Sequence, residues 1–576
     1  APGEDNSGGQ KDKDTTDNTG KPALTEQTIN LPVAWQSEPD YDADTADIYL
    51  FAPILPSSYT MTEGIDLPVI TVTVGDDGSL PDAPLARVTF GVATEQFDLA
   101  PGGTYYFDLS GETIPGTVNT SLPDSSLKWV PFTYAGTINA YNLETDDNGT
   151  ATTEARANEL LSDRSLFVAD HNITLSVSWD ELNASSNNLI FGKSYTSGGV
   201  GYKLRSLSMG SEDNEQPDDQ NRGMPEINEW DQILNKDNGF IQAYYLKATW
   251  GQDTLPNDEP LRVCQGFQSA RFFNWGPPSL KMSYIGFRPA LEILNPDTLG
   301  SDGLKTVTYD IGSNGTLGAG SLTSATMVYT GTLILPEITE ANGFQYTGAT
   351  GAGTLGWYDE GNQFYKAGTA LTDLPTGTTL TPGYGVTEQF TLTPGETYYF
   401  DLSGETIPGT KNTDLPDSSL KWVPFTYAGT VNAYSLDASS SGNPGASAAA
   451  GGNPSDRSLF VADYNVTDTV SWDELNNSSN NLIFGKNYIS DGVAYTLRSL
   501  SVGSGSTGYD DTMRGTPESN EWDQILNKDS DSIKNWSEIY SWGQDTHSNN
   551  TSDRMVRGYG SARLACLPVL RVPPRP

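Results

Sequence analysis

The sequence predicts an α+β fold with few short helices, repeated in two copies along one chain. Most segments are short runs of β-branched and aromatic residues separated by Gly, Asn, Ser and Asp, which is typical of strands and turns. Only two segments per copy carry a helix-start signal. Residues 104–141 return almost unchanged as residues 397–434. Because the repeated unit spans about 190 residues, each copy is expected to be a whole domain rather than a stacking element.

Size and composition favour a folded, acidic protein of several domains. A chain of 576 residues is too long for one core, and its 12 Trp, 28 Tyr and 19 Phe can fill several. The formal net charge of −42, with no local basic stripe, opposes binding to phosphate backbones, so no nucleic acid is expected as a partner. No run of about twenty apolar residues is present, so no membrane span is predicted.

The segments before the first copy differ in character. Residues 1–28 are polar and Gly-rich, which predicts a disordered leader. Residues 29–100 contain "DIYLFAPIL", "VITVTV" and "ARVTFGV", which predict a small β domain. The chain starts at Ala1 without Met or an apolar signal segment, which fits a processed export product. Cys264 and Cys566 lie at non-equivalent places in the copies, so no disulfide framework is predicted.

The repeat defines two modules and a spacer. Copy one is assigned to residues 101–304, the spacer to residues 305–384 and copy two to residues 385–576. The copies share "SWDELNASSNNLIFGK" or "SWDELNNSSNNLIFGK" and, in both, "EWDQILNKD". The spacer contains "KTVTYDIG", "ATMVYTGTLILPEI" and "GWYDEGNQFYKAGTAL", which predict further short strands.

Two helix starts are predicted in each copy. Ser178 with Glu181, and the same pair in copy two, fits a capping box, in which the Ser hydroxyl and the Glu carboxylate each take a backbone amide. For the second helix of copy two, Thr516 is the expected cap, followed by Pro517 at the first helical position. Copy one has Met224 in place of this Thr, so its helix is expected to be capped more weakly.

The order of the motifs carries a family resemblance. Each copy presents V-S-W, then "YKLRSLSMG" or "YTLRSLSVG", P-E-x-N-E-W-D-Q-I-L, "WGQDT" and R-V/M-x-x-G-[FY]-x-S-A-R, and copy one closes with "IGFRPALEI". This order resembles the formylglycine-generating-enzyme type of C-type-lectin fold over about residues 163–294 and 456–563. The resemblance implies two C-type-lectin-like modules. The same fold class includes the variable proteins of diversity-generating retroelements, which display a diversified patch just before a G-F-R-like motif.

The spacer resembles the internalin-type surface repeat through its L-P step, its G-W and its later aromatic-x-x-G-T. This resemblance implies a β-grasp-like spacer on a bacterial surface. Together the resemblances imply an exported protein, located at the bacterial cell surface or secreted.

Departures from the enzyme pattern argue against catalysis. The active-site cysteines of the enzyme family lie between its R-G-G-S-W and G-F-R motifs, and the corresponding residues 267–286 contain none. Cys264 lies just before this range, and copy two has Val556 there, so a reactive thiolate is not a property of the module. The two histidines have no histidine counterpart in the other copy, which removes a shared general base or zinc ligand. No catalytic residue, metal or cofactor is therefore predicted.

Acidic residues leave two alternatives open. Several carboxylates recur in both copies and could form an acid and base pair as in glycoside hydrolysis, but caps, turns and solvated surface explain them better. The loop at residues 211–221, "SEDNEQPDDQN", could hold Ca²⁺ through clustered oxygens, although copy two has no matching ligand spacing. The recurring carboxylates are Asp108, Glu112, Asp180, Glu181, Glu229 and Asp231.

Arginines and tryptophans in the shared motifs are expected to be structural framework. The planar guanidinium can hold irregular backbone by bonding several carbonyls or a carboxylate, and buried indoles contribute large apolar areas. These framework residues are Arg205, Trp230, Trp250, Arg262, Arg271 and Arg288.

The segment between the S-A-R and G-F-R motifs of copy one is the candidate binding surface. It reads "FFNWGPPSLKMSY" at residues 272–284 and combines clustered aromatics with Met and Lys. Rigid aromatic side chains bury large areas at little entropic cost, so an exposed cluster favours recognition; packing of the same aromatics in a core is the alternative. The expected contact residues are Phe272, Phe273, Asn274, Trp275, Ser279, Lys281, Met282 and Tyr284.

Copy two departs from copy one after Arg563, where it reads "LACLPVLRVPPRP" without G-F-R. The abrupt Arg and Pro composition resembles out-of-frame translation or a truncated gene, so copy two is expected to lack its last core strand and to be less stable.

The sequence thus predicts a non-enzymatic surface protein that binds a protein or glycan on another cell or a phage, with retroelement diversification of its loop as one hypothesis. A formylglycine-generating-enzyme-like oxidoreductase and a structural stalk or adhesin subunit without a specific ligand are the alternatives.

Overall fold

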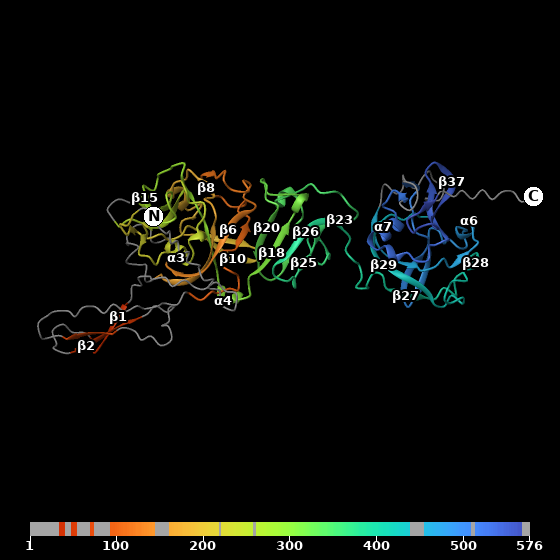
Figure 1. The fold of residues 1–576 in the computed structure, drawn as a ribbon, viewed down its shortest axis with the longest axis horizontal. Coiled ribbons are helices and arrows are strands. Elements are labelled where there is room, and N and C mark those ends of the chain that lie inside the picture. The colour runs from red at the N-terminus through yellow and green to blue at the C-terminus, as the bar shows by residue number, and fades with distance from the viewer. Residues whose placement is uncertain are drawn as a thin grey trace, which may run out of the picture. The chain divides into compact units, whose positions relative to one another are not determined.

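The protein is β-rich with few short helices, and its several sheets indicate more than one domain. The computed structural model describes residues 34–40, 48–54, 69–73, 93–144, 160–217, 220–256, 261–437, 454–507 and 513–566 (Figure 1). No helix within these ranges is long and apolar enough to cross a bilayer. The chain divides into two compact units, and the division falls within the spacer. The first unit holds Ala1–Thr308, Leu317–Leu333 and Pro375–Gly377, and the second holds Tyr309–Thr316, Ile334–Leu374 and Thr378–Pro576.

The first described strands form a small sheet. "DIYLFAPIL" and "VITVTV" supply two of its strands, as predicted, whereas "ARVTFGV" and the leader at 1–28 lie outside the described residues. The three strands pair antiparallel in chain order. They are β1 (Ala34–Glu38), β2 (Ile48–Ile54) and β3 (Ile70–Thr73).

Copy one is built on two six-stranded sheets. Its strands are β4 (Thr104–Phe107), β5 (Thr117–Val118), β6 (Val130–Ala140), β7 (Ser162–Ala169), β8 (Thr174–Leu175), β9 (Lys193–Ser197), β10 (Val200–Arg205), β11 (Glu212–Asp213), β12 (Gly223–Met224), β13 (Ala248–Thr254), β14 (Arg262–Gly266), β15 (Phe273–Gly276), β16 (Ile285–Phe287) and β17 (Ala290–Ile293). The sheet orders are β4-β6-β7-β17-β10-β9 and β15-β14-β13-β16-β8-β5. Each of the last two strands of the copy is therefore an interior strand of one sheet.

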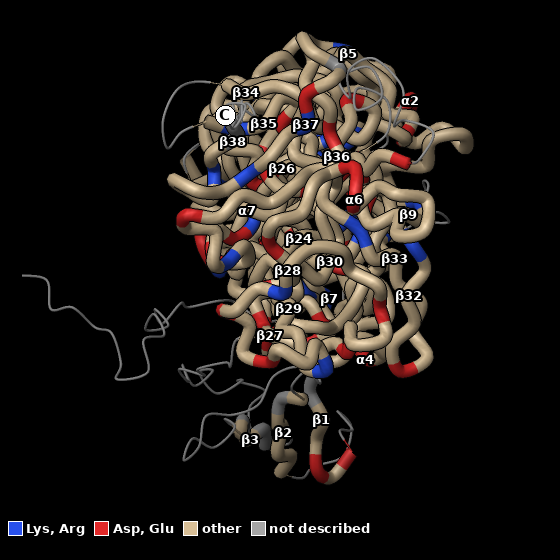
Figure 2. Tube along the Cα trace, turned by 90° about the vertical axis from the view of Figure 1, so that its right-hand side faces the viewer, with Lys and Arg blue, Asp and Glu red and all other residues tan. Residues whose placement is uncertain are grey.

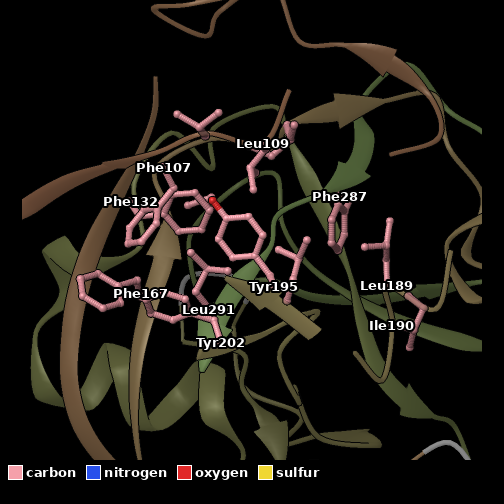
Figure 3. Packing of buried hydrophobic residues seen from close by; sticks show 14 of the residues in the cluster. Phe107, Leu109, Phe132, Phe167, Leu189, Ile190, Tyr195, Tyr202, Phe287 and Leu291 are labelled. Atoms are coloured by element: carbon pink, nitrogen blue, oxygen red, sulfur yellow. The ribbon is translucent and has the colours of Figure 1, made fainter. Parts of the chain in front are cut away.

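Strand β17 completes the main core of copy one. Leu291 lies opposite Phe167 of β7 on one side and Leu204 of β10 on the other. Figure 3 shows Leu291 beside Phe167 and Tyr202 within the aromatic cluster. Phe167 and Tyr202 make an edge-to-face contact with ring centroids 6.1 Å apart, a favoured aromatic geometry. The residues just after the G-F-R motif are thus part of the core and not of the surface.

Two of the short helices in each copy begin where a side-chain cap satisfies a free backbone amide. Ser178 and Glu181 form the predicted capping box, and copy two repeats it. The predicted cap at Thr516 is wrong: the second helix of copy two starts after Asn520, whose side chain accepts from the Asp523 amide. Copy one has an Asn at the same place, so no weaker cap results. The α-helices are α2 (Trp179–Asn183), α3 (Glu229–Lys236), α4 (Pro296–Leu299), α6 (Trp472–Leu475) and α7 (Glu521–Lys528), and the 3₁₀ helices are η2 (Asn238–Phe240), η3 (Gly312–Asn314), η4 (Glu340–Asn342) and η7 (Ser530–Ser532).

Copy one begins earlier than the predicted boundary at residue 101. Phe97 is only 3% exposed and belongs to the main core. The Glu95 carboxylate accepts from the Thr137 amide at 2.8 Å, and the Gln96 amide donates to the Thr137 hydroxyl at 2.9 Å. Copy two repeats the first contact through Glu388. The "TEQF" stretch before each first strand is therefore part of the module.

The spacer is a small β structure. Its strands β20 (Ser324–Tyr329), β18 (Lys305–Asp310), β26 (Thr378–Gly385), β23 (Thr354–Tyr358) and β24 (Phe364–Lys366) form a five-stranded sheet. The ring of Trp357 contacts those of Tyr309 and Phe344. On the side of copy one, the Ala319 amide donates to the Asp124 carboxylate at 2.7 Å. The other strands are β19 (Gly315–Leu317), β21 (Leu333–Ile334), β22 (Phe344–Tyr346) and β25 (Ala370–Leu371).

Copy two follows the same path but forms smaller sheets. Its strands are β27 (Thr397–Phe400), β28 (Thr410–Lys411), β29 (Val423–Ala433), β30 (Ser455–Ala462), β31 (Thr467–Asp468), β32 (Lys486–Ser490), β33 (Val493–Leu497), β34 (Gly505–Thr507), β35 (Arg514–Thr516), β36 (Tyr540–His547), β37 (Asn550–Gly558) and β38 (Ala565–Cys566). They pair as β27-β29-β30, β32-β33, β28-β31, β36-β37-β38 and β34-β35. Each six-stranded sheet of copy one is split in two here, because no strand among the described residues of copy two stands where β16 and β17 stand.

Candidate functional site

The candidate surface of copy one starts on an edge strand. Strand β15 pairs only with β14 among the described residues, with Trp275 opposite Val263 and Phe273 opposite Gln265. Phe273 is 2% exposed and packs in the cluster that contains Trp230, whereas Trp275 is 45% exposed. Their ring centroids lie 6.2 Å apart, so the exposed indole rests beside a buried ring. The strand thus leads from the core to the surface.

The structure divides the predicted contact residues into two groups. Phe273 lies in the core, so its side chain cannot contact a ligand, because the neighbouring apolar residues cover it. Tyr284 is half-buried and packs on Phe267 with ring centroids 4.9 Å apart, and Phe272 and Asn274 are also half-buried. The residues at the surface are Trp275, Ser279, Lys281 and Met282. We call these four the Trp275 surface.

The turn that carries the Trp275 surface is fixed on helix α2. The Pro278 carbonyl accepts from the Asp180 amide at 3.0 Å, and the Lys281 ammonium lies 2.5 Å from the Glu181 carboxylate. The hydrogen bond from Lys281 is the main cause that lowers the pKa of Glu181. Two further backbone bonds close turns within the segment, from Leu280 to Pro277 and from Ile285 to Met282. Ligand binding here would order little additional chain.

In the other six-stranded sheet of copy one, Arg205 on β10 organises a buried ion-pair network. Its guanidinium donates to both oxygens of Glu229, at 2.6 and 2.7 Å, and to Glu292 at 2.8 and 2.9 Å. Arg205 and Glu229 are both fully buried, and Glu292 is mostly buried. Arg164 adds a second guanidinium, 3.4 Å from Glu229. Two arginines thus balance two carboxylates across the sheet, which is how buried charges are tolerated.

The other predicted framework residues are buried or half-buried. Arg288 donates to the carbonyls of residues 169 and 170, and burial lowers its pKa to about 10. Arg262 lies over the ring of Trp179 with 4.0 Å between its guanidinium carbon and the ring centroid. Arg271 is half-buried and donates to the Leu234 carbonyl at 3.2 Å. The indoles of Trp230 and Trp250 are fully buried and donate to the carbonyls of residues 270 and 177.

Comparisons of the chain with protein-family models, curated proteins and solved structures found no match. The resemblance to C-type-lectin modules therefore continues to rest on the order of the sequence motifs. The structure supports the coarser description of a β-rich chain with several sheets and few short helices.

In copy one, the thiol and the imidazole that an enzyme could use for catalysis are both partly or fully buried, and burial shifts their pKa values. Burial raises the pKa of the Cys264 thiol to about 12, which disfavours the thiolate that nucleophilic chemistry needs. Burial also lowers the pKa of His171. Within the described ranges, no group of three or more His, Cys, Asp or Glu side chains could hold a metal ion. Part of the acidic loop at 211–221, including Asp218 and Asp219, lies outside the described residues, so calcium binding stays an alternative.

Acidic and basic residues are interspersed along the described part of the chain. Figure 2 shows acidic and basic positions interspersed along the trace, without a continuous basic run in the part described. Several lysines are paired, as Lys193 is with Glu112 at 2.5 Å. Exclusion of nucleic acid as a partner stays a prediction, and this distribution is compatible with it.

The main unexpected feature is the burial of Asp231, one of the recurring carboxylates that the sequence analysis explained as caps, turns and solvated surface. One oxygen of Asp231 accepts from Asn228 at 2.7 Å, but the other has no hydrogen-bond partner, and the nearest guanidinium, of Arg271, is 3.9 Å away. In copy two the matching Asp523 binds Arg557 at 2.5 and 3.0 Å. Copy one has Gln265 where copy two has Arg557, and this single difference could have been read from the aligned copies.

This buried carboxylate, with one oxygen that accepts no hydrogen bond, predicts a pH dependence. Burial raises the pKa of Asp231 to about 7, so the folded state holds its proton more tightly than the unfolded state, whose pKa is about 4. Copy one should therefore lose stability as pH rises from about 4 to about 7, by up to about 4 kcal/mol for a shift of about three units. The charged groups around Asp231 are Arg222, Glu226 and Arg271.

Gln265→Arg should remove most of this loss at pH 7 by pairing Asp231 as Arg557 pairs Asp523. The measurement is urea unfolding of the full chain, with copy one followed by labelling of the Cys264 thiol in a Cys566→Ser background. A disulfide reagent that reacts at acidic pH allows both ends of the range to be sampled. If Gln265→Arg and its parent lose stability equally between pH 4 and pH 7, Asp231 is not the cause.

Proposed function

We propose that copy one binds a protein or glycan ligand on another cell or on a phage through the Trp275 surface. The observation that carries the proposal is the 45% exposure of Trp275 on a segment whose backbone is otherwise held in place. A large, rigid aromatic group at the surface is the side chain most often found at binding hot spots. Ser279 and Lys281, four and six residues further along the chain, supply polar contacts, and Met282 supplies an adaptable apolar one.

The proposed class of module is C-type-lectin-like, and the proposed location is the bacterial surface or the medium. The motif order supports the first, and the internalin-type features of the spacer support the second. Diversification of the loop by a retroelement is part of the hypothesis, because the Trp275 surface directly precedes the G-F-R motif at residues 286–288. The raised pKa and burial of Cys264 favour binding over oxidoreductase chemistry.

Trp275→Ala is expected to reduce ligand binding at least about tenfold, because a central Trp in an interface contributes about 2 kcal/mol or more. The full chain is applied to arrays of glycans and of bacterial and phage surface proteins, beside the variant. Trp422→Ala is the matched control, since Trp422 of copy two is 65% exposed and therefore equally able to bind nonspecifically.

Loss of a signal with Trp275→Ala but not with Trp422→Ala would support the proposal. Equal loss with both variants would indicate nonspecific adhesion of exposed indoles. Full retention with Trp275→Ala, or silence of the parent chain on every array, would count against a binding role and favour the structural stalk.

A further inference from the structure

The loop that precedes strand β13 has the same backbone in both copies. Ala243, Leu246 and Phe267 have φ angles of 45°, 57° and 90°, a left-handed region that residues other than Gly rarely adopt. The Leu246 amide donates to the Phe267 carbonyl at 2.7 Å, and the Phe267 amide donates to the Tyr244 carbonyl at 3.1 Å. The matching φ angles of copy two are 49°, 60° and 76°, and both matching hydrogen bonds are 2.9 Å long. The loop conformation therefore belongs to the module and not to one copy.

The side chains on this loop differ between the copies. Tyr245 is 70% exposed and Leu246 is 50% exposed, whereas copy two has Ser537 and Glu538 at these places. Because Ser and Glu fit the same backbone, folding of the module does not require apolar side chains here. Exposed apolar side chains that folding does not explain indicate a contact with another molecule.

Two half-buried aromatic rings lie next to the loop. Phe267 is bridged to Tyr245 by backbone pairing, and the ring of Tyr284 lies 4.9 Å from that of Phe267. The Ala248 amide donates to the Tyr284 carbonyl at 2.7 Å, which ties this ring to strand β13. A surface held in this way loses little conformational freedom when a partner binds. The Tyr245 surface, as we call it, consists of Tyr245, Leu246, Lys247, Phe267 and Tyr284.

The segments that form the Tyr245 surface contain no acidic residue. No Asp or Glu occurs in residues 238–252 or 261–291, although 74 of the 576 residues of the chain are acidic. The part of copy two that matches residues 238–252 contains Asp531 and Glu538. The cores of protein interfaces are depleted of Asp and Glu and enriched in Tyr, Trp, Phe, Met and Arg. The composition of these segments therefore favours a protein as the partner.

Two cations at this place have no carboxylate in contact with them. Among the described residues, Lys247 forms no ion pair, and Arg288 donates only to backbone carbonyls, one of them that of Ala243 at 3.4 Å. Asp170, the acid whose charge acts on Arg288, is buried. Copy two has Ile539 in place of Lys247. An acidic group of a partner would thus meet positive charge at this surface.

We propose that the Tyr245 surface binds a second protein, through a segment that presents apolar side chains next to acidic ones. Tyr245 and Leu246 bury the apolar side chains of the partner, and Tyr is among the residues most frequent at binding hot spots. Lys247 pairs with a carboxylate, and the buried charge of Arg288 adds to the attraction. Binding here does not require the Trp275 surface, so the two proposals can fail separately.

The probe is a library of random peptides displayed on phage, selected on the immobilised full chain. The retained peptides should carry aromatic or aliphatic residues beside Asp or Glu. The most enriched peptide is then synthesised with a fluorophore and titrated with the full chain, and binding is followed by anisotropy. A chain with Tyr245→Ser, Leu246→Glu and Lys247→Ile has the residues of copy two on an unchanged backbone. It should bind the peptide at least about tenfold more weakly.

Two further variants separate the apolar from the charged part of the contact. Tyr399→Ser is the matched control for Tyr245→Ser, since Tyr399 of copy two is 57% exposed, and it should leave binding unchanged. Lys247→Glu should weaken binding about three- to tenfold, because an exposed ion pair becomes a repulsion, and Lys247→Arg should restore it. An unchanged thermal unfolding midpoint shows that each variant is folded.

Three results would overturn the proposal. The first is that no peptide is retained, or that the retained peptides lack acidic residues. The second is equal binding of the enriched peptide to the parent chain and to the triple variant. The third is binding of hyaluronan, tested in parallel as an acidic glycan, that the triple variant loses while no peptide binds, which would make the partner a glycan.

Discussion

Arg205→Ala is expected to lower the free energy of unfolding of copy one by about 3–5 kcal/mol, the usual cost of leaving one partner of a buried ion pair unpaired. The substitution removes four hydrogen bonds to two carboxylates, those of Glu229 and Glu292. Glu229 has no access to solvent, so water cannot replace the guanidinium there. Arg164, at 3.4 Å, can compensate only in part.

The matched variant is Arg498→Ala in copy two, which should cost less. Arg498 binds one carboxylate instead of two, and its side chain keeps some access to solvent. Urea unfolding of the full chain separates the effects when copy one is read by Cys264 and copy two by a Val556→Cys reporter at the equivalent place. Equal losses in the two copies would show that Glu292 contributes nothing to the network. Arg205→Lys provides a milder change, since it keeps the charge and loses the bidentate geometry.

Local features of the fold could be predicted because short-range chemistry determines them. The capping boxes at Ser178 and at its counterpart in copy two depend on side chains three residues apart, and both form. The error at Thr516 had a local cause too: Asn520 is an equally good cap and lies next to the first helical residue. Signals of this kind decide where an element starts but not what packs on it.

The sequence pattern could not predict which parts of the chain pack against each other. Trp129 and Trp422 lie in the same segment, "DSSLKWVPFTYAGT", yet Trp129 is 4% exposed and Trp422 is 65% exposed. In copy one the neighbouring Asp124 is bound by the spacer amide of Ala319, a contact that no residue within the repeat specifies. Identical local sequence therefore leaves burial undetermined when the covering element comes from elsewhere in the chain.

The same limit explains the candidate site. An aromatic cluster at residues 272–275 predicts recognition or core, and the structure shows both, with Phe273 inside and Trp275 outside. Which ring is covered depends on the cluster around Trp230, whose residues come from distant strands and helix α3. Composition could identify the segment, but only the fold assigns each side chain to a surface or to the core.

Cleavage of the full chain after Phe460 is expected to be about 10 to 100 times faster than cleavage after Phe167, corresponding to about 1.4–2.7 kcal/mol less resistance to local opening. Both bonds lie in the identical sequence "SLFVAD", so the intrinsic preference of chymotrypsin is the same. The strands differ in their surroundings. Strand β7 lies between two partners and is buried along most of its length, whereas β30 has one partner and half-buried side chains.

Limited proteolysis with quantification of both peptides by mass spectrometry measures the ratio within one sample. Local opening exposes the bond before the protease cuts, so the rate follows the stability of each strand when reclosing is fast. Equal rates after Phe167 and Phe460 would contradict the lower stability of copy two. They would also imply that an interior strand such as β17, with Leu291 and Glu292 in contact with both neighbours, adds no local stability to a six-stranded sheet.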